Sequence, residues 1–291
     1  MSETEVSIIM PAFNESQSIG DIIHKIANLY PDFEIIVIND GSTDDTASVA
    51  KEAGAIVYSH PYNVGNGAAI KSGIRIASGG ILVFMDGDGQ HDPEEIEKML
   101  KYFPEYDMVV GARPKGHQAF WLRRYGNKIF NSLASYVAKF RIQDLTSGCR
   151  AIKSDIAHKF LFLLPNTYSY PTTLTLSVLR DGRCVKYIPI SVRGRKTGKS
   201  KIRIFRDGLK FLMIITKICT FYSPLRIFLP VSFLMFFAGL SYYVYTLITV
   251  HRFTNMSALL FTTSILIFMM GLISEQISQM RFERGEGDKF I

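Results

Sequence analysis

Two aspartates separated by one glycine, Asp86 and Asp88, follow the apolar run Ile81–Met85. Carboxylates this close raise each other's pKa and disfavour the doubly ionised state unless a cation lies between them. Carboxylates on a loop after a buried strand are also suitable ligands for Mg²⁺ or Mn²⁺, with phosphate oxygens and water in the remaining octahedral positions. The pair therefore indicates either a divalent-cation site or the cap of a plain turn.

Two other motifs share these letters, and the residues that follow distinguish them. An EF-hand loop needs an acid or asparagine at its fifth position and glycine at its sixth, where this chain has Gln90 and His91. A phosphatase of the haloacid dehalogenase type needs threonine or valine at the position of Gln90, and its motif normally lies near the N-terminus. Neither motif fits, whereas a plain turn stays open when the motif is taken alone.

The elements that position these aspartates follow from the hydrophobic pattern of residues 6–112. Short β-rich runs alternate with amphipathic stretches, which is typical of a parallel sheet covered by helices on both faces. The predicted strands are 6–10, 34–39, 55–59, 81–85 and 107–112, and the predicted helices are 16–30, 44–53, 67–77 and 93–103.

Polar residues fall where three of these strands end. They are Asn14–Glu15 after the first strand, Asn39–Gly41 after the second and Asp86–Gln90 after the fourth. In open α/β sheets, ligands bind beyond the carboxyl ends of the strands. We therefore expect these groups to line one crevice.

The composition limits the classes of partner. Lys and Arg outnumber Asp and Glu by 33 to 26 in 291 residues, which suits anionic partners such as phosphorylated metabolites or anionic lipid. The three cysteines are scattered, which favours a reducing cytosolic setting. The N-terminus lacks the features of a secretory signal. No basic nucleic-acid motif is present and the strand ends are acidic, so we expect no nucleic-acid partner.

The C-terminal part predicts a membrane hairpin. Residues 227–250 and 253–274 carry no charged side chain, and each exceeds the roughly 20 residues that a span needs. The alternative is two buried core helices. Basic residues flank the pair outside the short link, which places both termini and the globular domain on the cytoplasmic side. The expected domains are 1–200 (catalytic), 201–226 (basic amphipathic juxtamembrane helices), 227–280 (transmembrane hairpin) and 281–291 (cytoplasmic tail).

Residues 117–140 indicate a long helix with aromatic positions among basic ones. It is either a surface helix packed on the sheet or a helix in the membrane interface, with Phe120, Trp121 and Phe130 inserted. The basic stretch 193–210 ahead of the spans fits anionic lipid or phosphate.

Four motifs in order carry a family resemblance: PAFNE (11–15), INDGSTDDT (38–46), NVGNGAAIKSG (63–73) and DGDGQHDPEE (86–95). With them the chain resembles the family 2 glycosyltransferases of GT-A fold, and among these the polyprenyl-phosphate glycosyltransferases similar to dolichyl-phosphate mannose synthase. The resemblance continues through GAR (111–113), DLTSGCRAI (144–152), YSYPTTLTL (168–176) and R…GKSK (193–201). It implies an α/β, Rossmann-like, mostly parallel sheet flanked by helices, with interface helices and the C-terminal hairpin.

The resemblance also implies the donor site. Pro11, Phe13 and Glu15 would contact the base and ribose of a UDP- or GDP-linked sugar, Asp40 would contact the base, and Gly67 would allow close backbone approach near it. Asp86, Asp88 and Gln90 would form the metal and diphosphate centre, with Asp88 as the main ligand. Many relatives carry a basic residue where this chain has Asn66, so no direct diphosphate contact is expected there.

The acceptor is inferred from what the sequence lacks. A hydroxyl acceptor usually needs a general base, and residues 165–182 offer only Asp181, which we interpret as a helix end. A lipid phosphate is already anionic and needs cations to hold it in line with the anomeric carbon. The cations available for that role are Arg113, Arg123, Arg124, Arg193, Lys199 and Lys201.

The sequence therefore predicts an inverting transferase that needs Mg²⁺ or Mn²⁺ and acts at the cytosolic membrane face. It would move one sugar from a nucleotide diphosphate to a polyprenyl (dolichyl or undecaprenyl) phosphate, with Asp86, Asp88 and Arg113 in catalytic roles. The alternatives are a membrane-tethered glycosyltransferase that acts on a hydroxyl acceptor, and a catalytically silent membrane scaffold of the same fold. A processive synthase is disfavoured because the only tryptophan, Trp121, lacks the Q-x-x-R-W context. Helix association could also build a homo-oligomer.

Overall fold

The chain divides into two compact units, Met1–Ile202 and Arg203–Ile291. The computed structural model describes residues 5–103, 105–113, 131–132, 134–136, 138–167, 169–191 and 223–287, with side chains up to 280 in the last range.

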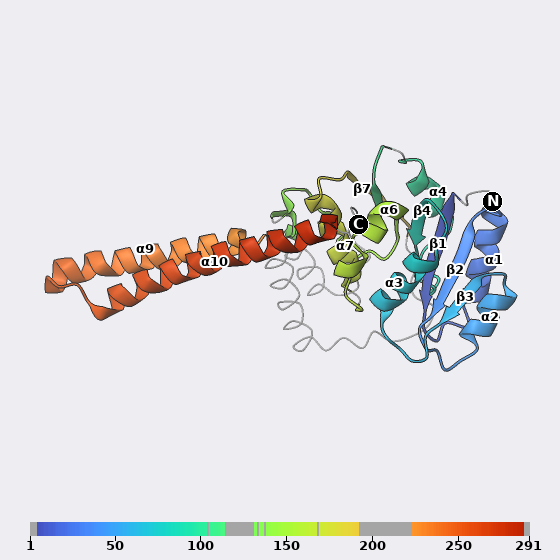
Figure 1. Cartoon of the computed structure of the whole chain (residues 1–291), viewed down its shortest axis with the longest axis horizontal. Helices are drawn as coiled ribbons and strands as arrows, with labels where there is room; N and C mark the ends of the chain where they lie inside the picture. Colours follow the sequence, from blue (N-terminus) through green and yellow to red (C-terminus); the bar gives the residue numbers. More distant parts are fainter. Residues whose placement is uncertain are drawn as a thin grey trace. The chain divides into compact units, whose positions relative to one another are not determined.

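A seven-stranded sheet forms the centre of the first unit, in the order β3-β2-β1-β4-β6-β5-β7 (Figure 1). Every neighbouring pair is parallel except those of β6, which runs antiparallel to both β4 and β5. The strands are β1 (Val6–Ala12), β2 (Glu34–Asn39), β3 (Ile56–Ser59), β4 (Ile81–Phe84), β5 (Met108–Ala112), β6 (Arg150–Lys153) and β7 (Val185–Pro189).

The predicted alternation of strands and helices is confirmed, because each apolar run became a strand, buried except at the edge strand β3, and each amphipathic stretch became a helix. All seven residues of β1 are buried, and helix α1 buries its isoleucines against the sheet. The helices of this unit are α1 (Ile19–Leu29), α2 (Thr46–Glu52), α3 (Asn66–Ile76), α4 (Glu95–Leu100), α6 (Ser154–Lys159) and α7 (Tyr170–Arg180), with a 3₁₀ turn at Leu161–Leu163. Of the helix expected over 117–140, residues 131–132, 134–136 and 138–140 are described, and these are helical up to residue 138, after which the chain turns.

Strands β6 and β7 were not predicted. β6 is four residues long with a basic residue at each end, so it lacks the apolar run by which a strand is recognised. Its antiparallel direction has a consequence for the site. The segment that precedes β6, residues 144–149, lies at the same sheet edge as the carboxyl ends of β4 and β5, because Arg150 pairs with Phe84 and with Val110.

At the opposite end of β5, Asp107 ties three strands together. Its carboxylate accepts hydrogen bonds from the Cys184 backbone amide and from Lys153 Nζ, both at 2.9 Å. Burial alone would raise the pKa of Asp107, but these two hydrogen bonds outweigh it and lower the pKa below its ordinary value. Asp107 therefore stabilises the start of the strand that carries Arg113 at its other end.

We expect Asp107→Asn to lower the free energy of unfolding at neutral pH by about 1–2 kcal/mol. Because the pKa is lower in the folded state, the contribution is complete above the unfolded value near 3.9 and is lost as pH falls through the folded value. Chemical denaturation of the solubilised protein, with the exposed Asp32→Asn as control, measures this. A difference between wild type and Asp107→Asn that stayed constant down to pH 2 would contradict it.

The second unit contains a long helical hairpin, α9 (Leu225–Val250) and α10 (Asn255–Gly287) (Figure 1). The chain reverses at His251, which has a left-handed conformation with φ 52°. At the base of the hairpin, the Glu275 carboxylate accepts a hydrogen bond from the backbone amide of Leu225 at 3.2 Å. This satisfies one of the free amides at the start of α9 and places a negative charge at its positive end.

Small residues spaced seven apart form the seam between the two helices. A seven-residue period keeps one face of each helix toward its partner, and small residues let the backbones approach closely. Ser232 and Ser264 hydrogen-bond reciprocally, each hydroxyl donating to the other's carbonyl at 3.0 and 2.9 Å. The buried positions of the seam are Ser232, Gly239 and Thr246 on α9 and Ser257, Ser264, Gly271 and Ser278 on α10.

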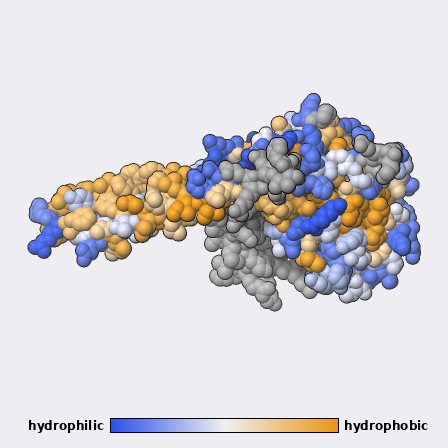
Figure 2. Space-filling model, viewed as in Figure 1, coloured by the Kyte–Doolittle hydropathy of each residue, from blue (hydrophilic) through white to orange (hydrophobic). Residues whose placement is uncertain are grey.

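The outer surface of the hairpin is apolar and exposed. Leu225–Val250 and Asn255–Met280 are long and apolar enough to cross a membrane, with mean hydropathies of 1.8 and 2.1. In the most apolar stretch of each helix, only 11% and 17% of the residues are buried, so the alternative of two soluble core helices does not fit. Figure 2 shows this hydrophobic surface along the hairpin.

Gly271→Leu is expected to destabilise the hairpin by about 1–3 kcal/mol, because it overpacks the seam. A Cβ atom at Gly271 would lie 2.7 Å from the Cβ of Phe228. Unfolding of the full chain in mixed micelles with increasing SDS measures the effect. Ile273→Leu, at an exposed position two residues away, is the matched control. Equal SDS midpoints of unfolding for the two variants would contradict the placement of Gly271 in the seam between the helices.

Candidate active site

The loops after β1 and β2 form one wall of the site, because hydrogen bonds join them. The Asn14 amide donates to Ser42 Oγ at 3.0 Å, and the Thr43 amide donates to Asn14 Oδ1 at 2.9 Å. Asn14 adopts a left-handed conformation, with φ 56°, in making this turn. Among the residues expected to contact the donor, Pro11 is buried inside β1, whereas Phe13 is 44% exposed.

Glu15 and Asp40 lie beside this wall with different surroundings. The Glu15 backbone amide donates to Thr46 Oγ1 at 2.9 Å, which fixes the loop against the start of α2. Asp40 is buried, and its carboxylate accepts hydrogen bonds from the Val64 and Gly65 amides, both at 2.9 Å. These oxygens hold the loop after β3, and the predicted contact of Asp40 with the base stays a prediction.

His60 extends this arrangement toward α3. Its Nδ1 lies 2.7 Å from Asp40 Oδ1, and its Nε2 lies 2.9 Å from Ser72 Oγ. The three side chains connect the end of β2, the end of β3 and the middle of α3. We infer that they set the position of the loop that leads into α3.

Glycine at positions 65 and 67 is explained by a neighbouring segment of the chain. A Cβ atom at Gly67 would lie 2.1 Å from the Pro165 carbonyl oxygen, and one at Gly65 would lie 2.3 Å from that of Asn166. The Gly67 amide also donates to the Asn166 carbonyl at 3.1 Å. Gly67 therefore permits a close approach by the chain's own backbone. Contact of Gly67 with a base stays a prediction.

The two aspartates that follow β4 lie in contrasting environments. Asp88 accepts hydrogen bonds from the backbone amide of Gln90, at 3.1 Å, and from the Gln90 side chain. Burial raises the pKa of Asp86, and the negative charge of Asp88 raises it further. The side chain of Asn66 opposes this by hydrogen-bonding Asp86. Asn66 therefore contacts the Asp86 carboxylate. No diphosphate contact was expected for Asn66.

His91 is a site residue that the sequence reasoning missed. It is buried at 8% exposure, and its Nδ1 has no hydrogen-bond partner among the described residues. Burial lowers its pKa, while the charges of Asp86 and Asp88 act in the opposite direction. The only signal in the sequence was its position directly after Gln90.

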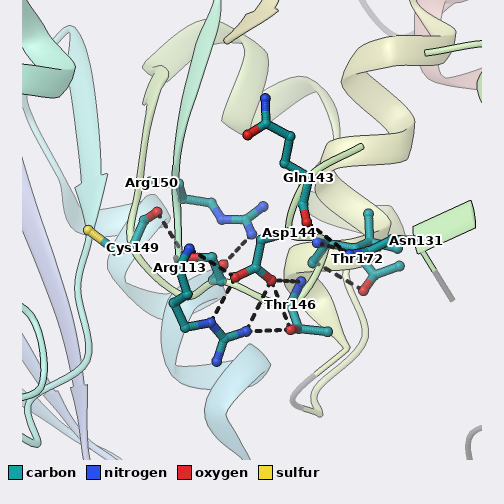
Figure 3. Close-up of polar contacts among 10 residues, drawn as sticks. Arg113, Asn131, Gln143, Asp144, Thr146, Cys149, Arg150 and Thr172 are labelled. Atoms are coloured by element: carbon teal, nitrogen blue, oxygen red, sulfur yellow. Dashed lines mark hydrogen bonds and ion pairs between the residues drawn. The ribbon is translucent and has the colours of Figure 1, made fainter. Parts of the chain in front are cut away.

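Arg113 and Asp144 form a two-pronged ion pair (Figure 3). Arg113 Nε lies 2.7 Å from Asp144 Oδ2 and Nη2 lies 3.0 Å from Oδ1, while Nη2 also donates to Thr146 Oγ1 at 2.6 Å. These hydrogen bonds raise the pKa of Arg113. Burial acts to raise the pKa of Asp144, but Arg113 outweighs it and the net direction is down. Both groups are therefore charged at neutral pH, and the guanidinium is held in one orientation.

The remaining predicted cations, Arg123, Arg124, Arg193, Lys199 and Lys201, lie outside the described residues. Asp181 is where the sequence placed it, at the end of α7, and it is paired with Lys159 at 2.6 Å and with Arg183 at 3.2 Å. Each carboxylate oxygen of Asp181 is thus engaged by a cation at the end of the helix, which disfavours Asp181 as a general base.

The oxygen groups after β4 fit a hard divalent cation. Burial and repulsion from Asp88 raise the pKa of Asp86, and a nearby positive ion would oppose both. The buried Oδ1 of Asn66 has no hydrogen-bond partner in the described part of the chain. Within that part, no three His, Cys, Asp or Glu side chains are grouped as a complete metal site. Asp88, Asp86 and Gln90 would therefore supply only part of a coordination shell, which suits an ion that also binds diphosphate and water.

Comparisons with known proteins agree with this geometry. Residues 7–161 match the model of glycosyl transferase family 2, and residues 223–280 match that of the GtrB C-terminal hairpin. An uncharacterised protein of Methanocaldococcus jannaschii is 30% identical over 223 residues, which are 73% of this chain and 91% of that protein. Undecaprenyl-phosphate 4-deoxy-4-formamido-L-arabinose transferase of Proteus mirabilis is 26% identical over 296 residues, covering 95% of this chain and 89% of that enzyme.

Among solved structures, a similar fold occurs in glucosyl-3-phosphoglycerate synthase from Mycobacterium tuberculosis, in a complex with Mn²⁺, UDP and phosphoglyceric acid. The TM-score is 0.60 at 20% identity, over 74% of this chain and 77% of that one. The fold and the acidic strand end thus define a glycosyltransferase of GT-A fold. The chain belongs to glycosyltransferase family 2, with a GtrB-type hairpin at its C-terminal end, as its motifs predicted.

Proposed function

We propose that this enzyme transfers a single sugar from a uridine or guanosine diphosphate sugar to a polyprenyl phosphate. The observation that carries the proposal is the Arg113–Asp144 pair, a fixed cation whose carboxylate partner is fully engaged. Such a pair can bind an anionic acceptor but is poorly suited to removing a proton from a hydroxyl. The apolar hairpin and the name of the Proteus mirabilis relative support the same acceptor.

In the proposed reaction, an oxygen of the acceptor phosphate attacks the anomeric carbon from the face opposite the leaving group. The new bond joins this carbon to the phosphate oxygen, and the bond to the diphosphate oxygen breaks, with its electron pair leaving on the nucleoside diphosphate. The configuration inverts, and no proton has to be moved. Arg113 would hold the acceptor phosphate in line, because its guanidinium is pre-oriented by Asp144.

On the donor side, Asp88 and Gln90 would hold Mg²⁺ or Mn²⁺, with Asp86 supporting the ion or orienting the donor through water. The ion, when bound, neutralises charge on the departing diphosphate. Pro11, Phe13, Glu15, Asp40 and Gly67 would line the nucleotide side, with Asp40 acting through the loop that it holds.

The same proposal covers the setting of the enzyme. The catalytic domain (1–200) and both termini would lie on the cytoplasmic side, joined by the basic segment 201–226 to the hairpin 227–280, with 281–291 as a tail. The hairpin would keep the active site where the lipid is, and hairpins of several copies could associate into a homo-oligomer.

The test is transfer of radiolabelled sugar in membranes from UDP-glucose, UDP-GlcNAc or GDP-mannose to a short polyprenyl phosphate, with Mn²⁺ or Mg²⁺. The proposal predicts labelled lipid from one donor, lost on addition of EDTA and restored by excess metal. If the enzyme released free sugar and no lipid product from every donor that it consumes, polyprenyl phosphate would not be its acceptor.

A further inference from the structure

Arg150 is a fully buried arginine that the proposed reaction does not use. Its Nη1 donates to the Pro171 carbonyl at 2.8 Å and to Thr175 Oγ1 at 3.0 Å, and its Nη2 donates to the Ser147 carbonyl. Within the described part of the chain it forms no ion pair, and its Nε lacks a partner. A buried guanidinium without a counter-charge is costly, so fold stability alone does not explain an arginine here.

Ser147, which Arg150 contacts, lies within residues 144–149. This segment lies between Arg113, on the acceptor side of the site, and Asp86, on the donor side. One residue before it, Thr146 accepts a hydrogen bond from Arg113 at 2.6 Å. One residue after it, Gly148 lies so close to Asp86 that a Cβ atom there would be 2.6 Å from Asp86 Oδ2. Residues 144–149 therefore contact the cation proposed for the acceptor and a carboxylate proposed for the donor metal.

Arg150 fixes this segment to two rigid elements. Its own backbone lies in β6, between β4 and β5. Its side chain reaches the first turns of α7 through Pro171 and Thr175 (Figure 3 shows Arg150 above the Arg113–Asp144 pair). Displacement of Ser147 would move the backbone on both sides of it, and with it Thr146 and Gly148.

We propose that Arg150 is a positioning residue, which holds the Ser147 carbonyl and so sets the placement of Arg113 relative to Asp86. The inference rests on the proposed function, because it assigns the acceptor phosphate to Arg113. It makes two claims. The segment 144–149 depends on the Arg150 guanidinium for its order, and loss of that order weakens acceptor binding through Arg113.

The first claim is tested without any catalytic readout, by hydrogen–deuterium exchange on the full chain in lipid nanodiscs. Arg150→Met removes the donors while keeping an unbranched, uncharged side chain of similar length. We expect faster exchange in peptides covering 144–149, and unchanged exchange in β2. Arg150→Lys, which keeps one donor group, should recover part of the protection. Unchanged exchange over 144–149 in Arg150→Met would overturn the proposal.

A matched pair of variants on α7 separates this effect from general loss of packing. Thr175→Val and Ser177→Ala each remove a fully buried hydroxyl from the same helix, but only Thr175 contacts Arg150. Exchange over 144–149 should rise in Thr175→Val and stay at the wild-type rate in Ser177→Ala. Equal effects of the two would attribute the change to α7 stability and overturn the proposal.

The second claim is tested by a double-mutant cycle with Arg113→Lys. If Arg150 acts through Arg113, Arg150→Met should raise the KM for polyprenyl phosphate on the order of tenfold in the wild-type background, and by less than about twofold in the Arg113→Lys background. A purely structural role would give equal factors in both, which would overturn this claim. Absence of transfer by wild type would instead refute the proposed function, and the exchange result would still decide the role of Arg150.

Discussion

Asp88→Asn is expected to lower the rate of lipid-linked sugar formation by about 100- to 1,000-fold, the range for loss of a group that stabilises negative charge developing on a leaving group. Asparagine keeps the size of the side chain and one oxygen, but it removes the charge that attracts a divalent cation. The expected signature is a rise in the Mn²⁺ concentration needed for half-maximal rate. Transfer assays over a metal titration measure both quantities.

The chain offers a matched control for this variant four residues further on. Asp92 is also an aspartate of the segment after β4, but its carboxylate pairs with Lys25 at 2.7 Å on the protein surface. Asp92→Asn should leave the metal requirement unchanged. If Asp88→Asn kept the wild-type rate and metal dependence, the metal centre would lie elsewhere, and the assignment of Asp86 and Gln90 would be withdrawn with it.

The second large effect is expected at Arg113. Arg113→Lys should raise the KM for polyprenyl phosphate by about 10- to 100-fold, because a hydrogen bond to a charged group is worth about 1.5–3 kcal/mol and lysine cannot reproduce the two-pronged pairing with Asp144. The affinity for the nucleotide sugar should stay close to that of wild type. Steady-state kinetics with each substrate varied in turn separate the two effects.

Arg183→Lys is the control for the chemical change itself, since Arg183 also pairs with an aspartate, Asp181, but at the end of α7. It should leave both KM values at their wild-type level. An Arg113→Lys enzyme with an unchanged KM for the lipid and a raised KM for the donor would contradict the assignment, and would move Arg113 to the nucleotide side.

The sheet was predictable because its strands are recognisable in isolation. β1, β2 and β4 are continuous apolar runs, and in a parallel sheet their carboxyl ends meet at one edge, which brings Asp40 and Asp86 to the same region before any coordinates are known. β6 was not predictable in this way, since a short strand with a basic residue at each end depends on its neighbours for burial. Its direction then places residues 144–149 in the site.

The detailed roles of the site residues depended on contacts across the fold. Asp40 was recognised as polar at a strand end, but only the structure shows that its oxygens are occupied by the amides of Val64 and Gly65. In the same way, Asp144 was visible as part of a motif, whereas its partner Arg113 lies 31 residues earlier in the sequence. Pairings over such distances leave no local signal in a single sequence.

The acceptor is the central claim, and two lipids of equal length test it most directly. Wild-type enzyme with its preferred donor and metal is offered a polyprenyl phosphate or the corresponding polyprenol, and labelled lipid is quantified for each. The account predicts efficient transfer to the phosphate and no transfer above background to the alcohol, because the carboxylate paired with Arg113, Asp144, is occupied by its hydrogen bonds to that guanidinium. Transfer to the alcohol at a comparable rate would contradict it.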